Sequence, residues 1–192
     1  MIIVTSLIDH ANVCASARVK DLISVIDPGF EPKTPYSIIN HLKLGFDDIT
    51  EVSKGNFIYR NGITNIPDIE SQQIPPNEHH IKKIINFVSN WDRVQPILIH
   101  CWCGVSRSMA VATFILCMIR PKNIDLNIKF IRSIAPHANP NKLMLSMFGK
   151  YLGVEKELIE SFKKYPYTVT YDCKTTFAPI SIFKLKEFRD FK

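Results

Sequence analysis

The stretch ILIHCWCGVSRS, residues 97–108, indicates more about this chain than any other part of its sequence. Residues 96–100 form a short aliphatic run that opens with a proline, which is typical of a buried β-strand. Residues 109–119 are apolar or small apart from Thr113. Such a run is too short to span a bilayer but suits a helix buried on all sides, which Pro121 should bring to an end. The sequence therefore predicts a buried strand, a loop and a buried helix in direct succession.

The loop between this strand and this helix has the residues of an anion-binding site with a thiol at its floor. Gly104 can take backbone conformations closed to other residues, and a loop at a helix N-terminus presents unpaired N–H groups to an anion. We expect the same field to favour the thiolate of Cys101, the form in which a cysteine is nucleophilic. Arg107 can bind two phosphate oxygens with its planar guanidinium, and the Ser108 hydroxyl can stabilise the sulfur. His100 is expected to orient the loop through backbone hydrogen bonds.

The pattern His-Cys-(five residues)-Arg-Ser at 100–108 resembles the signature of the cysteine-dependent protein tyrosine phosphatases. It looks most like the small dual-specificity-type members and the compact bacterial members. The resemblance implies a three-layer α/β fold and a phosphocysteine intermediate, with no metal or other cofactor. It also implies that Cys101 is the nucleophile, Arg107 the phosphate clamp and Ser108 the thiolate stabiliser. Residues of the loop would bind the substrate phosphate, namely Trp102, Cys103, Gly104, Val105, Ser106 and Arg107.

Cys103 departs from the family pattern, because such loops often carry alanine, glutamate or lysine at this position. The backbone site stays possible, but the loop has no charged side chain that would select a polyphosphorylated ligand. We expect Cys103 to be a buried thiol, since a disulfide to Cys101 would close a strained ring across one residue.

The reaction also needs a general acid to protonate the leaving oxygen. The alternating apolar strand at 41–46 leads into Asp47 and Asp48, and alignment with the family's strand-then-Asp element falls on Asp48. Asp68 is the alternative, because it lies thirty-three residues before Cys101, a separation closer to that of the smaller relatives. We favour Asp48, since a strand end mounts a catalytic group rigidly, with Asp47 as a residue that orients the loop. Both acids could instead cap turns.

Residues 50–76 are then an insertion with little periodicity, and long loops in a compact domain are usually functional or disordered. Its aromatic centre, residues 57–59, predicts a lid over the pocket. Deleting Gly55 to Asn65 should therefore impair turnover of a peptide more than turnover of a small aryl phosphate.

Strands and helices alternate along the chain, which predicts an α/β fold of three layers whose central, mostly parallel sheet is flanked by helices. Asn77 should cap an amphipathic helix over 77–91. We expect a catalytic domain over 1–164 and a C-terminal extension over 165–192 that packs on it, with a short amphipathic helix at 183–189. The other strands are predicted over 2–7, 22–26 and 37–46, and the other helices over 125–134, 140–152 and 154–164.

Composition limits the class of protein. A hydrophobic content of 46% supports one buried core in 192 residues, and we expect neither a secretory signal nor a membrane-spanning segment. The net charge of +6 comes from scattered residues, so we expect no nucleic-acid partner but a phosphorylated protein or peptide substrate. Five cysteines without framework spacing favour a reducing compartment, the cytoplasm. Oligomeric state is not readable from the sequence.

Three other hypotheses compete with phosphomonoester hydrolysis. A zinc site from His100, Cys101, Cys103 and the pair His79 and His80 lacks the paired ligand spacing that structural zinc requires. A rhodanese-like sulfurtransferase also places a cysteine at a helix N-terminus, but Arg107 and Ser108 suit a tetrahedral dianion better. A phosphate-binding module without turnover would follow if neither Asp48 nor Asp68 faces the pocket.

Overall fold

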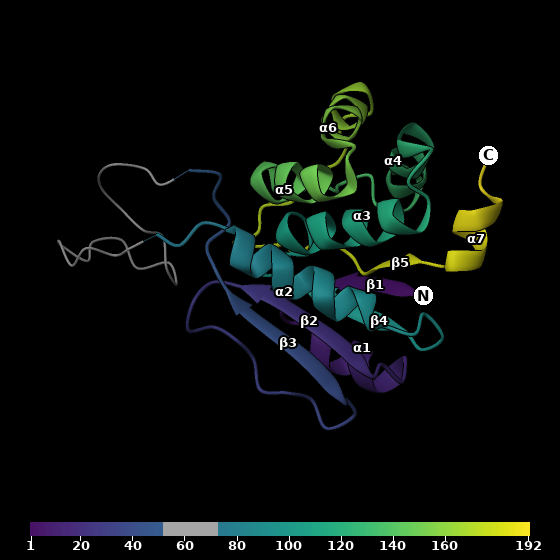
Figure 1. Ribbon diagram of the computed structural model, residues 1–192. Coiled ribbons are helices and arrows are strands. Elements are labelled where there is room, and N and C mark those ends of the chain that lie inside the picture. Colours follow the sequence, from purple (N-terminus) through teal and green to yellow (C-terminus); the bar gives the residue numbers. More distant parts are fainter. Residues whose placement is uncertain (52–72) are drawn as a thin grey trace.

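The computed structural model describes residues 1–51 and 73–192, which form one α/β unit (Figure 1). The described residues contain a five-stranded sheet of order β3-β2-β4-β1-β5. Its strands are β1 (Ile2–Thr5), β2 (Asp21–Ile26), β3 (Asn40–Gly45), β4 (Ile97–His100) and β5 (Ser181–Phe183). The first four strands are parallel, and β5 runs antiparallel to β1. The predicted three-layer fold with a mostly parallel sheet is confirmed.

Helices cover the two faces of the sheet unequally. Helix α1 (His10–Ser16) packs on one face through a small cluster of buried residues around Cys14. The opposite face carries the main core and is covered by the longer helices, as Figure 1 shows. These are α2 (Glu78–Ser89), α3 (Arg107–Ile119), α4 (Ile124–Ile134), α5 (Lys142–Leu152) and α6 (Glu155–Lys164). The seven-residue α1 was not predicted, because it has neither a capping side chain nor a long periodic pattern.

The predicted buried helix is the centre of the molecule. Every residue of α3 from Arg107 to Cys117 is buried, and the helix ends at Ile119, with Arg120 as its C-cap just before Pro121. Helix α2 starts as expected, since the Asn77 side chain accepts a hydrogen bond from the His80 N–H while the His80 ring accepts one from Asn77. Its apolar stripe faces the core. Local sequence signals therefore set the elements that hold the loop at 101–106.

The C-terminal residues 165–192 pack against the rest of the domain. The Thr168 N–H donates to the Pro136 carbonyl, and β5 extends the sheet beside β1. Helix α7 (Leu185–Asp190) begins two residues later than the amphipathic helix expected from the sequence. Its Phe188 is fully buried and lies against the Arg120 guanidinium, 4.1 Å from ring centre to Cζ. Among the described residues no helix is long and apolar enough to cross a bilayer.

Candidate active site

The loop at 101–106 lies between the end of β4 and the start of α3, at the carboxyl ends of the parallel strands. In open α/β sheets this edge is where ligands bind. Gly104 has φ +80°, and a Cβ there would lie 3.1 Å from the carbonyl carbon of Thr5, at the end of β1. The turn therefore requires glycine both for its backbone conformation and for its close approach to β1.

The backbone carbonyls of this loop are bonded outward, by groups from four parts of the chain. The acceptors and donors are Cys101 O with His100 Nδ1 (3.3 Å), Trp102 O with Leu7 N (3.1 Å), Cys103 O with Ala178 N (3.2 Å) and Val105 O with Asn139 N (3.0 Å). In a trans peptide the following N–H points the opposite way. Accordingly the Gly104 N–H donates to the Cys101 Sγ at 3.3 Å. The loop thus forms a concave group of N–H donors around the sulfur, which is an anion-binding arrangement.

Cys101 is 2% exposed, and its Sγ lies 3.1 Å from the Ser108 hydroxyl. Ser108 is fully buried in the first turn of α3. The sulfur therefore has two polar neighbours, this hydroxyl and the Gly104 N–H, that can donate to a thiolate. Both contacts lie at the N-terminus of α3, whose dipole favours negative charge.

Arg107 is buried, and its guanidinium makes its hydrogen bonds to described residues through Nη1. Its Nη1 donates to the Asp27 carboxylate at 2.6 Å and to the Phe46 carbonyl at 2.5 Å. Burial lowers the pKa of this guanidinium, but the charges of Asp48, Cys101 and Asp27 outweigh that effect and raise it. Its Nε has no hydrogen-bond acceptor among the described residues, and the nearest carboxylate oxygen, on Asp48, is 3.8 Å away. A buried cationic donor is thus left available beside the loop.

Asp48 lies at the rim of the loop, just beyond the end of β3. Its Oδ1 accepts hydrogen bonds from the Ser106 hydroxyl and from the Asn141 side chain, both at 2.8 Å. Asn141 is itself fixed, because it caps α5 by accepting from the Met144 N–H. The Asp48 side chain is 34% exposed, so a carboxyl group is mounted between the loop and solvent.

Asp47 has a different place. Its carboxylate accepts a hydrogen bond from the Ile74 N–H, and its own N–H donates to the Ile74 carbonyl, both at 2.7 Å. It therefore fastens the chain at residue 74 to the end of β3, beside Asp48. Asp68 and the expected lid at Gly55 to Asn65 lie outside the described residues.

Cys103 corrects one expectation from the sequence. It is buried, but as half of a disulfide with Cys173 rather than as a free thiol, while Cys14, Cys101 and Cys117 are free. The extension passes over the loop and brings the two Cα atoms to 5.6 Å, a pairing that spans seventy residues of sequence. The Ala178 N–H that binds Cys103 O belongs to the same segment. Residues 173–178 are therefore in contact with the loop at 101–106.

Asp27 was missed as a site residue, because Asp27-Pro28-Gly29 reads as a turn. One signal was present: an acid directly after a parallel strand lies at the same sheet edge as the loop. Phe30 follows in this turn, and its ring meets the Trp102 ring edge-on at 5.6 Å between centres. The half-buried Phe30 ring therefore lies against a half-buried residue of the loop itself.

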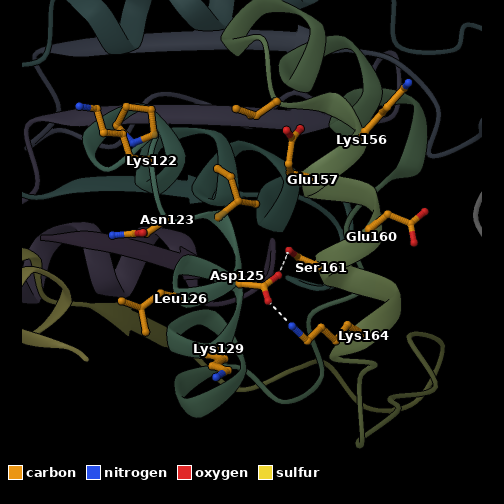
Figure 2. A pocket seen from close by; sticks show the side chains of 13 residues that line it. Lys122, Asn123, Asp125, Leu126, Lys129, Lys156, Glu157, Glu160, Ser161 and Lys164 are labelled. Atoms are coloured by element: carbon orange, nitrogen blue, oxygen red, sulfur yellow. Dashed lines mark hydrogen bonds and ion pairs between the residues drawn. The ribbon is translucent and has the colours of Figure 1, made fainter.

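One cavity among the described residues lies away from the loop. It has a volume of about 830 Å³ and opens between the start of α4 and the length of α6 (Figure 2). Its walls carry charges of both signs, and Asp125 is bonded there to Ser161 and Lys164. None of its lining residues belongs to the loop or to its supports.

Comparisons with known proteins agree with this geometry. Residues 66–140 match the protein-tyrosine phosphatase family, a range that includes β4, the loop and α3. This match supports the resemblance to the cysteine-dependent protein tyrosine phosphatases that the residues at 100–108 indicate. No curated protein matches its sequence.

Three solved structures share the fold of this chain. DUSP15 superimposes with a TM-score of 0.57 at 17% identity, covering 87% of this chain and 94% of the other. The Yvh1 phosphatase domain from Chaetomium thermophilum gives 0.56 at 17% identity, covering 82% and 93%. PTPMT1, in a structure with PI(5)P, gives 0.55 at 15% identity, covering 83% and 93%. At these identities the likeness concerns the fold.

Proposed function

We propose that this chain hydrolyses phosphomonoesters through a phosphocysteine intermediate and prefers phosphotyrosine on proteins or peptides. One observation supports the proposal above all others: the Cys101 sulfur accepts from the Gly104 N–H, beside the buried Arg107 guanidinium, whose Nε lacks an acceptor among the described residues. A tetrahedral dianion would occupy this site, with its oxygens on the loop amides and on Arg107. The sulfur would then be in line to attack phosphorus.

In the first step the Cys101 thiolate forms an S–P bond while the bond from phosphorus to the leaving oxygen breaks. Asp48, as the carboxylic acid, gives its proton to that oxygen. In the second step water attacks phosphorus and Asp48, now a carboxylate, takes its proton. The S–P bond breaks, inorganic phosphate leaves, and the Ser108 hydroxyl donates a hydrogen bond to the returning thiolate.

The preference for an aryl substrate is supported by the rings of Trp102, in the loop, and Phe30, which packs edge-on against it. The loop between Cys101 and Arg107 has no lysine, which weighs against a polyphosphorylated lipid headgroup. Because PTPMT1, which shares the fold, was solved with PI(5)P, a phosphoinositide is the alternative substrate to compare with phosphotyrosine. The cytoplasmic location expected from the cysteine count is also a proposal, and the Cys103–Cys173 disulfide weighs against it.

The test is hydrolysis of an aryl phosphate by the purified chain in EDTA, with Cys101→Ser measured alongside. Activity that survives the chelator and is lost in Cys101→Ser supports the proposal. Phosphotyrosine peptide, phosphoserine peptide and a monophosphorylated phosphoinositide are then compared by kcat/KM. A higher value for the lipid would refute the preference for phosphotyrosine.

Two results would replace the proposal. Vanadate binding that requires Arg107, without any turnover, would identify a phosphate-binding module. Transfer of sulfur from thiosulfate to cyanide by the wild-type chain would identify a sulfurtransferase.

A further inference from the structure

Ser24 is a fully buried polar residue within the apolar run 22–26 of strand β2. The sheet register aligns it with His100 of the neighbouring strand β4, and His41 lies on the other neighbour, β3. Its hydroxyl is 2.6 Å from the His100 Nε2 and 2.7 Å from the His41 Nε2. Thr34 continues the series, with its hydroxyl 2.9 Å from the His41 Nδ1. Four side chains thus connect the surface with the start of the phosphate-binding loop.

The direction of each hydrogen bond in this series follows from its final acceptor, the Cys101 carbonyl oxygen. The Cys101 carbonyl can only accept, so the His100 Nδ1 must carry the proton. Burial, with smaller contributions from His10, His41 and Arg107, lowers the pKa of His100 to about 3, so its ring is neutral and its Nε2 accepts. The Ser24 hydroxyl must therefore donate to His100.

The same reasoning fixes the next two links. Because its only hydrogen is used, the Ser24 oxygen accepts from the His41 Nε2–H. Burial, with Lys43 and His10, lowers the pKa of His41 to about 4, so this ring is also neutral and its Nδ1 accepts from the Thr34 hydroxyl. Every proton in the chain is then directed from Thr34 toward Cys101.

We propose that Ser24, His41 and Thr34 are positioning residues that act through His100 to fix the first peptide of the phosphate-binding loop. With Nδ1–H on His100, the Cys101 carbonyl is held outward and the Trp102 N–H faces the anion. With the other tautomer, a lone pair would face that carbonyl, and the peptide would lose the contact that orients it. The proposal rests on the proposed function, because it assigns these residues to the same site.

The neighbouring ring of His10 supports this assignment. It stacks on His100 with 4.5 Å between centres, and its own Nδ1 is engaged by the Leu7 carbonyl at 2.5 Å. Among the described residues no three His, Cys, Asp or Glu side chains are placed to hold a metal ion. The nitrogens of His100 and His41 are all used within the hydrogen-bond chain. The histidines therefore act as hydrogen-bonding groups in the structure.

The first test reads the tautomers without any turnover. Long-range ¹H–¹⁵N correlation spectra of the full-length protein at neutral pH should show His100 with its proton on Nδ1 and His41 with its proton on Nε2. His41→Asn assigns the His41 signals by their loss. A His100 ring protonated on Nε2, or on both nitrogens, would overturn the proposal even if the chain proves to have no phosphatase activity.

The second test measures the consequence for the site. Ser24→Ala should lower kcat for an aryl phosphate and raise the vanadate inhibition constant in parallel, each by roughly tenfold, the size of one lost buried hydrogen bond. It should also change the His100 tautomer signals, and Ser24→Thr, which keeps the hydroxyl, should restore both. The matched control is Ser181→Ala, since Ser181 is equally buried on β5 and its hydroxyl has no partner among the described residues.

The outcomes separate the two proposals. An inactive wild-type chain refutes the proposed function and leaves the tautomer test to decide the positioning role. An active chain in which Ser24→Ala behaves like Ser181→Ala refutes the positioning role and leaves the proposed function intact.

Discussion

Asp48→Asn is the substitution that tests the mechanism most directly. Asparagine keeps the volume and one carbonyl oxygen, which can still accept from Ser106 and Asn141 as Oδ1 does now. It removes the ability to donate a proton as an acid. The substitution therefore separates the proton transfer from the structural contacts of this side chain.

The two effects differ in size. A general acid contributes about 10²–10⁴ in rate, or roughly 3–5 kcal/mol of barrier. The ion pair that is also lost, between the Asp48 Oδ2 and the Arg107 Nε, has a distance of 3.8 Å and a carboxylate one-third exposed. Such a pair contributes at most about 1 kcal/mol, or less than tenfold. A loss of a hundredfold or more on phosphotyrosine would therefore report the missing proton.

The assay is steady-state kinetics with a series of aryl phosphates whose leaving phenols rise in pKa. The nitrophenyl ester, whose leaving group needs little protonation, should lose less than about tenfold in kcat, and phosphotyrosine about 10²–10⁴. Asp47→Asn is the control, because Asp47 binds the Ile74 backbone and faces the chain at residue 74. It should leave the dependence on the leaving group unchanged.

One result would refute the assignment of the acid. If Asp48→Asn retains turnover of phosphotyrosine while Asp68→Asn loses it selectively for poor leaving groups, Asp68 is the acid. Asp48 would then be only an anchor for Ser106 and Asn141.

Three further predictions concern the supports of the site. Asp27→Asn should lower kcat/KM by roughly tenfold to a hundredfold, the size of one hydrogen bond to a charged group, because Arg107 loses its anionic partner; unchanged kinetics would contradict this. Gly104→Ala should abolish phosphate binding in calorimetry, whereas Gly153→Ala, at a similar φ of +71° but in open space, should cost stability alone. Finally, the free energy of unfolding in urea should fall as the pH drops from about 6.5 toward 4. In the folded chain His41 and His100 have pKa values of about 4 and 3. The unfolded chain therefore binds these protons at higher pH than the folded chain does, and protonation favours unfolding. Each histidine contributes at most about 1.4 kcal/mol per pH unit, and His41→Asn should reduce the slope by that amount.

The sequence predicted those parts of the site whose signals are local. The strand, the loop and α3 are continuous in sequence, so hydrophobic length, one glycine and one proline sufficed to place them. Asp48 was predicted as the acid because the strand over 41–46 leads into it and the family's strand-then-Asp element aligns there, and this role stays a prediction. The helix α2 could be predicted from its cap at Asn77 and its apolar stripe.

The parts that could not be predicted depend on contacts between distant segments. Cys173 meets Cys103 only because the extension crosses the loop after α6, and no spacing rule connects the two positions. Asp27 reads as a turn residue until the fold places it beside Arg107. Ser24 gave a partial signal, since a serine in a buried strand needs a partner, but the sequence does not say that the partners are His41 and His100.

The loop's orientation depends on these distant contacts. Its signature residues supply the sulfur, the guanidinium and the hydroxyl, but not the direction of its peptides. That direction is set by donors from the end of β1, from the segment before α5, from the C-terminal extension and from His100. Each outward carbonyl turns one N–H inward, so the loss of any one donor should weaken anion binding without altering the signature. A chain can therefore carry the complete motif and still bind phosphate poorly. The affinity for inorganic phosphate reports whether the surrounding contacts hold the loop N–H groups in the orientation that binds an anion.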